Sequence, residues 1–230
     1  ANPGAWQLHG VFHKKLRKQR KKTEDGGVLQ QRDRELAEDE TRLAAQSGDE
    51  HDELLAGAAR YASKDDWRRA AKAYREAIAL RTDKPCAYFN LGAALANSGH
   101  LVEAAQRFLE AKERYPVGSD WAEATALVFD MLRLKECAEV AKPEWWNDQG
   151  LKALSARVVR AAPNEAAANQ MRAEVLSRLC DAWEAGPRTA AELKEAAARY
   201  ERTAALSNAP AQKASLAVDA AICRTLADAM

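Results

Sequence analysis

The sequence predicts an all-α protein built from antiparallel helix pairs, and two observations support this. Apolar residues make up 47% of the chain but aromatic residues only 7%, and much of the apolar fraction is alanine. Only 7 prolines and 11 glycines interrupt it, and runs of β-branched residues are scarce. This composition favours closely packed helices. The second observation is an internal repeat, which points to a modular helical array.

A shift of 34 residues superimposes two segments of matching character. The aligned pairs are Ala58 with Gly92, Tyr61 with Leu95, Trp67 with Leu101, Ala70 with Ala104, Tyr74 with Phe108, and Ala77 with Ala111. Small residues allow close approach where two antiparallel helices cross, and the aromatic residues fill the space between neighbouring repeats. The pattern therefore predicts two consecutive helical hairpins.

The second copy carries a recognisable motif. It reads Tyr88-x-x-Leu91-Gly92-x-x-Leu95, followed by Gly99, Ala104, Phe108, Ala111 and Pro116. This pattern resembles the tetratricopeptide repeat (TPR) at nearly every signature position, whereas the first copy matches more loosely. The resemblance implies a right-handed superhelical solenoid, with a concave face lined by the first helix of each pair.

Beyond Pro116 the spacing lengthens, because Pro116, Pro163 and Pro210 are 47 residues apart. This predicts irregular longer repeats toward the C-terminus, with helices at about 119–139, 144–161, 164–184, 188–207 and 211–229. The expected organisation is a basic flexible arm over 1–27, a charged helix over 28–50 and a TPR-like domain over 51–230. Within that domain we expect regular repeats at about 51–84 and 85–118, longer helix pairs at about 119–163 and 164–210, and a capping helix over 211–230. Residues 137–163 resemble a block found in TPR-type proteins of unicellular algae.

The resemblance implies a partner-binding groove. Its expected lining is Leu55, Ala59, Phe89, Asn90, Ala93, Asn97, Leu127, Asp130 and Met131. One TPR subtype grips acidic C-terminal tails with lysine, arginine and asparagine, and here Asn90 matches the asparagine. Leu55, Ala59, Asp120 and Ala124 stand where the other polar and basic residues are needed. Since a buried carboxylate requires a paired cation, we expect an apolar or basic partner rather than an acidic tail.

Trp145 and Trp146 are adjacent at an expected helix start, so their indoles do not both face one interior. We expect one to pack between helices and the other to be partly exposed. Aromatic side chains of this kind are frequent contact points in interfaces, so a binding role and a packing role both remain open.

The N-terminal arm contains a basic cluster. Its members are Lys14, Lys15, Arg17, Lys18, Arg20, Lys21 and Lys22. It is either a solvated tail, a nuclear-import or nucleic-acid patch, or a segment that contacts the acidic stretch behind it. No aromatic residue lies between these cations, so we expect only weak nucleic-acid binding.

The sequence predicts no enzyme, no cofactor and no metal site. His9 and His13 are spaced by four residues, but their neighbours are basic, and no P-loop, GxSxG or HExxH motif occurs. Four separated cysteines without a CxxC motif predict reduced thiols, and the absence of a membrane span predicts a soluble chain in an intracellular, reducing compartment. Cytoplasmic, nuclear and organellar locations all remain open. Because the chain begins at Ala1, we expect a fragment or a processed product.

The leading functional prediction is a protein–protein interaction scaffold, including a subunit of a larger assembly. The alternative is a nucleic-acid-associated factor held by its basic arm, with the repeats recruiting partners. The formal net charge of +1 supplies no global attraction to nucleic acid or membrane.

Overall fold

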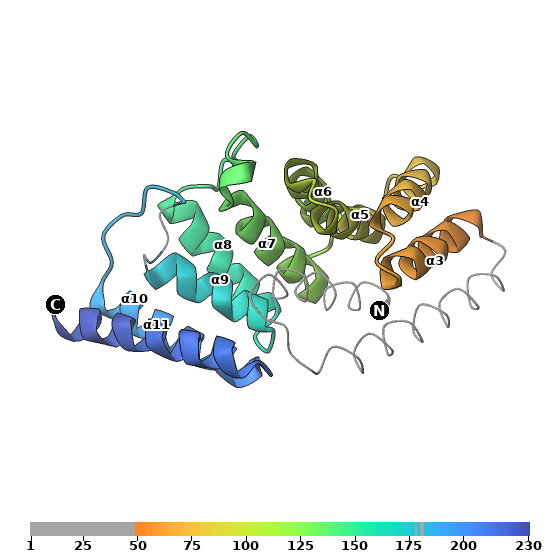
Figure 1. The fold of residues 1–230 in the computed structure, drawn as a ribbon. Coiled ribbons are helices and arrows are strands. Elements are labelled where there is room, and N and C mark those ends of the chain that lie inside the picture. Colours follow the sequence, from red (N-terminus) through yellow and green to blue (C-terminus); the bar gives the residue numbers. More distant parts are fainter. Residues whose placement is uncertain (1–48, 178, 180–181) are drawn as a thin grey trace. The chain divides into compact units, whose positions relative to one another are not determined.

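A computed structural model describes residues 49–177, 179 and 182–230. Within these residues the chain forms nine α-helices and one short 3₁₀ helix, and no strand, which confirms the all-α prediction (Figure 1). The chain separates between Tyr115 and Pro116 into two compact units. The arm predicted over 1–27, and the charged helix over 28–50 apart from its last two residues, lie outside the described residues.

The first unit contains two consecutive helix pairs. The helices are α3 (Glu50–Ser63), α4 (Trp67–Leu80), α5 (Pro85–Asn97) and α6 (Leu101–Arg114). Helix α4 packs against α3 and α5, and α6 packs against α5 (Figure 1). Each regular repeat expected from the sequence therefore contains one helix pair, as a TPR-like solenoid requires.

The two pairs turn in the same way. The turn residue is Asp65 in the first pair and Gly99 in the second, with φ angles of 62° and 90°. The closing hydrogen bonds also correspond, from Asp66 N to Tyr61 O and from His100 N to Leu95 O, both 2.9 Å long. Each turn is thus a Schellman motif, in which a residue with positive φ ends the helix. The two copies of the 34-residue repeat therefore match in backbone conformation as well as in sequence.

The small residues of the repeat lie where helices approach closely. Ala58, Ala70 and Ala104 are fully buried. A Cβ atom on Gly92 would lie 2.9 Å from two ring carbons of Phe108, which is itself fully buried. The glycine of the motif therefore makes room for the aromatic ring of the following helix.

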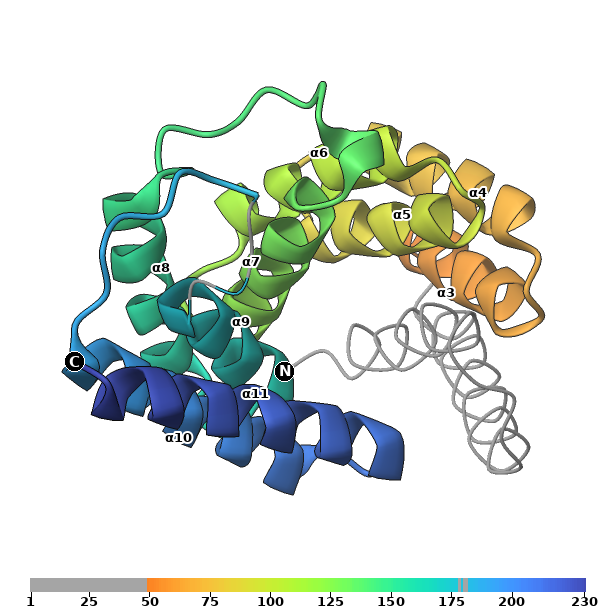
Figure 2. The ribbon, with the colours of Figure 1, turned by 60° about the vertical axis from the view of Figure 1, so that its left-hand side comes forward.

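The second unit contains five α-helices. They are α7 (Ser119–Leu132), α8 (Asp148–Ala161), α9 (Ala166–Ser177), α10 (Ala190–Leu206) and α11 (Pro210–Asp228), with a 3₁₀ turn at Lys135–Cys137. Helix α9 contacts α7 and α8 as well as α10, and α10 packs along α11 (Figure 2). Where α9, α10 and α11 meet, the core contains Leu176, Tyr200 and Leu216.

Two predicted helix ends in this unit were wrong. The helix expected to reach 139 ends at Leu132, and the one expected to reach 184 ends at Ser177. In the first case Lys142 Nζ donates to the carbonyls of Leu132 at 2.7 Å and Cys137 at 3.3 Å. In the second, Arg188 binds carbonyls in the last turn of α9. A cation at a helix C-terminus stabilises that end.

Three predicted helix starts were also too early, and one of them is α9, which begins at Ala166 rather than 164. Helix α8 begins at Asp148 rather than 144, because the side chain of Asn147 accepts from Gly150 N at 2.9 Å and caps the helix. Helix α10 begins at Ala190 rather than 188, after a capping box formed by Thr189 and Glu192. Helices α7 and α8 have 14 residues each, as α4 has, so the extra length of this pair lies in the connection over 133–147.

Candidate functional site

Helix α5 is the most enclosed helix of the first unit. It contacts α4 and α6, and ten of its 13 residues are buried. Proline at its start supplies a fixed φ angle and lacks the N–H that would otherwise be unsatisfied there. Four residues of the predicted groove therefore lie in a helix with little exposed surface.

Phe89 belongs to the core of this unit. Its side chain is 2% exposed, and its ring contacts those of Phe108 and Tyr115 edge to face, with centroids 5.5 and 6.4 Å away. Such pairs add about 0.5–1.5 kcal/mol beyond area burial. The apolar surface expected to face a partner is used within the fold.

Asn90 has an unsatisfied polar atom. Its side chain is 8% exposed, and its amide oxygen is buried without a hydrogen-bond donor. On the same helix, Asn97 Nδ2 donates to the Ala93 carbonyl at 2.9 Å. A buried acceptor without a donor costs roughly 1–3 kcal/mol, so a donor that reached the oxygen of Asn90 would stabilise the chain.

The other predicted groove residues lie on two further helices. Leu55 and Ala59 are half-buried on α3. Leu127 and Met131 are buried on α7 in the second unit, whereas Asp130 there is partly exposed and lies 3.5 Å from Arg133 Nη1. Of the nine residues, the six on α3 and α5 belong to the first unit and the three on α7 to the second.

The comparison with known families agrees with the repeat geometry. Residues 59–99, from α3 to the turn after α5, match the family model described as TPR repeat. The chain carries a tetratricopeptide repeat. No curated protein matches the sequence.

The TPR assignment gives the chain a general role as a protein–protein interaction scaffold. All-helical TPR folds are typically non-enzymatic. None of the helices in the described ranges is long and apolar enough to cross a membrane. The basic arm of Lys14, Lys15, Arg17, Lys18, Arg20, Lys21 and Lys22 lies outside the described residues, and its binding role stays a prediction.

In the second unit, Trp146 lies in an aromatic cluster. Its ring centroid is 5.8 Å from those of Phe129 and Trp145 and 6.2 Å from that of Trp183. Its Nε1 donates to the carbonyl of Ala182 at 3.3 Å. Both Trp145 and Trp146 are partly exposed, and Trp146 joins the connection after α7 to the connection after α9. Trp183 was not among the residues predicted to contribute, although a third tryptophan before the Gly186-Pro187 turn is a usable signal.

A charge network joins the starts of α8 and α10. Lys152 Nζ lies 3.2 Å from Asp148 Oδ2 and 2.8 Å from Glu192 Oε1, and Arg188 Nη2 lies 2.7 Å from Asp148 Oδ1. Burial alone raises the pKa of Asp148, but hydrogen bonds from Arg188 and Lys152 outweigh it and lower that pKa below its ordinary value. This network holds the connections of the second unit in place, and it was not predicted from the sequence.

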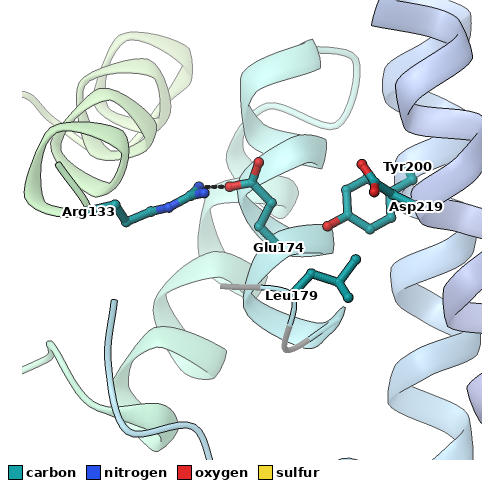
Figure 3. A pocket seen from close by; sticks show the side chains of 5 residues that line it. All are labelled: Arg133, Glu174, Leu179, Tyr200 and Asp219. Atoms are coloured by element: carbon teal, nitrogen blue, oxygen red, sulfur yellow. Dashed lines mark ion pairs between the residues drawn. The ribbon is translucent and has the colours of Figure 1, made fainter. Parts of the chain in front are cut away.

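A pocket of about 170 Å³ opens in the second unit. Its lining comprises Arg133, Glu174, Leu179, Tyr200 and Asp219. Figure 3 shows the guanidinium of Arg133 directed at Glu174, with which it forms an ion pair, and the carboxylate of Asp219 beside the ring of Tyr200. Burial raises the pKa of Tyr200 to about 12, and its hydroxyl lies 3.0 Å from Ser177 Oγ.

One cluster of possible metal ligands occurs among the described residues. Asp49, His51 and Asp52 bring ligand atoms within 4.8 Å of one another at the start of α3. The carboxylate of Asp49 already accepts from His51 N and from Arg81 Nη2, at 3.0 and 2.5 Å. Helix capping and an ion pair account for this arrangement without a metal.

Proposed function

We propose that the face formed by α3 and α5 binds a segment of a partner protein, so that the chain acts as an interaction subunit of a larger assembly. The observation that supports this most directly is the buried amide oxygen of Asn90, which has no donor. A backbone N–H from a bound segment supplies the missing hydrogen bond. The oxygen is buried, so binding includes a local shift of the side chains around it.

The residues of this face also indicate the chemistry of the partner. Leu55 and Ala59, the half-buried residues of this face, are uncharged. No cation is among the six predicted residues on α3 and α5, so an acidic tail would lose its hydration without gaining a counter-charge. We therefore propose an apolar or basic segment as the ligand.

Asn90→Leu is the sharpest test, because it keeps the size of the side chain and removes the unsatisfied acceptor. We expect the free energy of unfolding of the free protein to stay the same or rise by about 1 kcal/mol. Binding should fall, as measured by fluorescence anisotropy with peptides selected on the wild-type chain from a displayed library of random 16-residue sequences.

The matched control is Gln106→Leu, the same kind of change at an exposed position of α6. It should leave both stability and binding unchanged. Phe89→Ala is a poorer probe, because opening a cavity beside Phe108 costs about 3–5 kcal/mol and would confuse folding with binding. If no selected peptide loses affinity for Asn90→Leu, the binding face lies elsewhere.

A further inference from the structure

The last helix of the chain is apolar on two sides. Its buried side consists of Leu216, Ala220, Cys223 and Ala227, which face the rest of the second unit. A second row of large apolar residues, which we call the α11 stripe, consists of Val218, Ile222 and Leu226. These side chains are 59%, 40% and 45% exposed.

The α11 stripe is continuous along the helix. Positions four apart lie on one side of a helix, so the three side chains form a continuous row. The helix expected over 211–230 therefore exposes a surface suited to packing against another helix.

The pocket described above borders this stripe. Asp219 lies three residues after Leu216 and three before Ile222, so on α11 it stands between the buried side and the stripe. Figure 3 shows its carboxylate next to the ring of Tyr200 in the pocket lining. A side chain entering the pocket from a helix on the stripe therefore meets Asp219.

The charges of the pocket are not balanced. Glu174 is paired with Arg133, and it also accepts from Gln170 Nε2 at 2.9 Å. No cation of the described residues lies within ion-pair distance of Asp219, and burial raises the pKa of that carboxyl group. A lysine or arginine side chain from outside would compensate this carboxylate, and the volume of the pocket accommodates it.

We propose that the α11 stripe and the adjoining pocket bind an amphipathic helix of a partner protein, with a lysine or arginine beside Asp219 and apolar side chains over Val218, Ile222 and Leu226. This site is separate from the face formed by α3 and α5. A second copy of α11 is a poorer occupant, because it brings another Asp219. Its own cations, Lys213 and Arg224, are about 180–200° around the helix from Ile222.

The probe is a displayed library of random 16-residue peptides, selected on the full chain and measured by fluorescence anisotropy. We expect a class of binders with a lysine or arginine three or four positions from apolar residues. Asp219→Asn and Ile222→Ser should each weaken these peptides at least tenfold. The control is Asp228→Asn, an exposed change on another side of α11, which should leave the affinity of these peptides unchanged. Replacing the basic residue of the peptide with norleucine should cause a similar loss, with no further loss on Asp219→Asn.

Several results would overturn the proposal. They are the absence of any enriched peptide, enriched peptides without a basic residue, and equal binding by wild type and Asp219→Asn. Self-association that Ile222→Ser abolishes, seen by analytical ultracentrifugation, would assign the stripe to a second copy. Val218→Ser provides a second stripe variant, and circular dichroism checks that each variant is folded. The same peptides should bind Asn90→Leu normally, so this site and the α3–α5 face are tested independently.

Discussion

The guanidinium of Arg188 lies 2.7 Å from the carboxylate of Asp148 and also donates to the carbonyls of Val175 and Leu176, at 2.8 and 3.1 Å. The Arg188 side chain is 3% exposed. One buried cation thus joins the start of α8 to the end of α9.

Replacing this cation should therefore destabilise the second unit strongly. Arg188→Met removes one of the two cations beside Asp148 and leaves the carbonyls of Val175 and Leu176 without this donor, which costs about 3–5 kcal/mol. Urea unfolding followed by tryptophan fluorescence measures the change. Arg224→Met is the control, because Arg224 pairs with Glu201 at an exposed position and such pairs contribute about 0–1 kcal/mol. Similar unfolding of the two variants would contradict the capping role.

The same ion pair predicts a loss of stability in acid. The pKa of Asp148 is lowered in the folded state, so the folded chain binds fewer protons than the unfolded chain near the ordinary aspartate value of 3.8. Stability from this group is present above that value and is lost as pH falls through the folded pKa. Asp148→Asn should cost about 1.5–3 kcal/mol at pH 7. The difference from wild type should shrink below pH 4, and a constant difference would exclude the linkage.

The buried carboxyl group of Glu123 should make stability depend on pH in the opposite direction. It is 8% exposed on α7, and burial together with the nearby carboxylates of Asp120 and Glu165 raises its pKa from 4.5 to about 8. The folded state therefore binds more protons between these values, and stability falls as pH rises from 4.5 to 8. Across this interval, the free energy of unfolding of Glu123→Gln should rise relative to that of wild type by on the order of 1 kcal/mol per pH unit. Urea unfolding at pH 5, 7 and 9 measures this, with exposed Glu113→Gln as the control, and a flat profile would contradict it.

Gly150 predicts a steric effect. A Cβ atom there would lie 2.4 Å from the carbonyl oxygen of Trp145, and this obstacle is backbone rather than a flexible side chain. Gly150→Ala should cost about 1–3 kcal/mol or more. Gly57→Ala is the matched control, because nothing lies within 4 Å of its Cβ position inside α3. It should stabilise by about 0.5–1 kcal/mol. Thermal unfolding distinguishes the two, and equal midpoints would refute the close approach.

The two repeat turns predict a reciprocal pair of effects. Asp65 has the positive φ that favours glycine, and Gly99 occupies the equivalent position in the second pair. Asp65→Gly should raise the free energy of unfolding by about 0.5–1 kcal/mol, and Gly99→Ala should lower it by about 1–2 kcal/mol. Denaturant unfolding measures both. Changes of the same sign would show that the turns are not equivalent.

The repeat was predictable because its signals are local. The 34-residue spacing placed Trp67 and Leu101 at equivalent positions, and each is the first residue of its helix. Where the predicted helix ends were wrong, the deciding contact came from farther along the chain. The ends of α7 and α9 depend on Lys142 and Arg188, which follow those helices by ten or more residues. A periodic pattern within a helix contains no information about such a cation.

The candidate site was predictable only in part. The position of Asn90 in the repeat predicted that it lies on α5. It did not predict the burial of the amide oxygen, because that burial depends on packing around the helix. Phe89 was expected to face a partner, whereas its ring packs on Phe108 and Tyr115. The α11 stripe had a sequence signal, since Val218, Ile222 and Leu226 are spaced by four. It was missed because the last helix was expected to cap the array.

The capping of α9 by Arg188 has a consequence for synthesis of the chain. Because translation proceeds from the N-terminus, all of α9 leaves the ribosome before the residue that closes its end. The last turn then has free carbonyl groups until Arg188 emerges and reaches Val175 and Leu176. Truncated chains that stop between 177 and 188 should keep α9 frayed. Changes in the length of that connection should be tolerated as long as the arginine can still reach the helix.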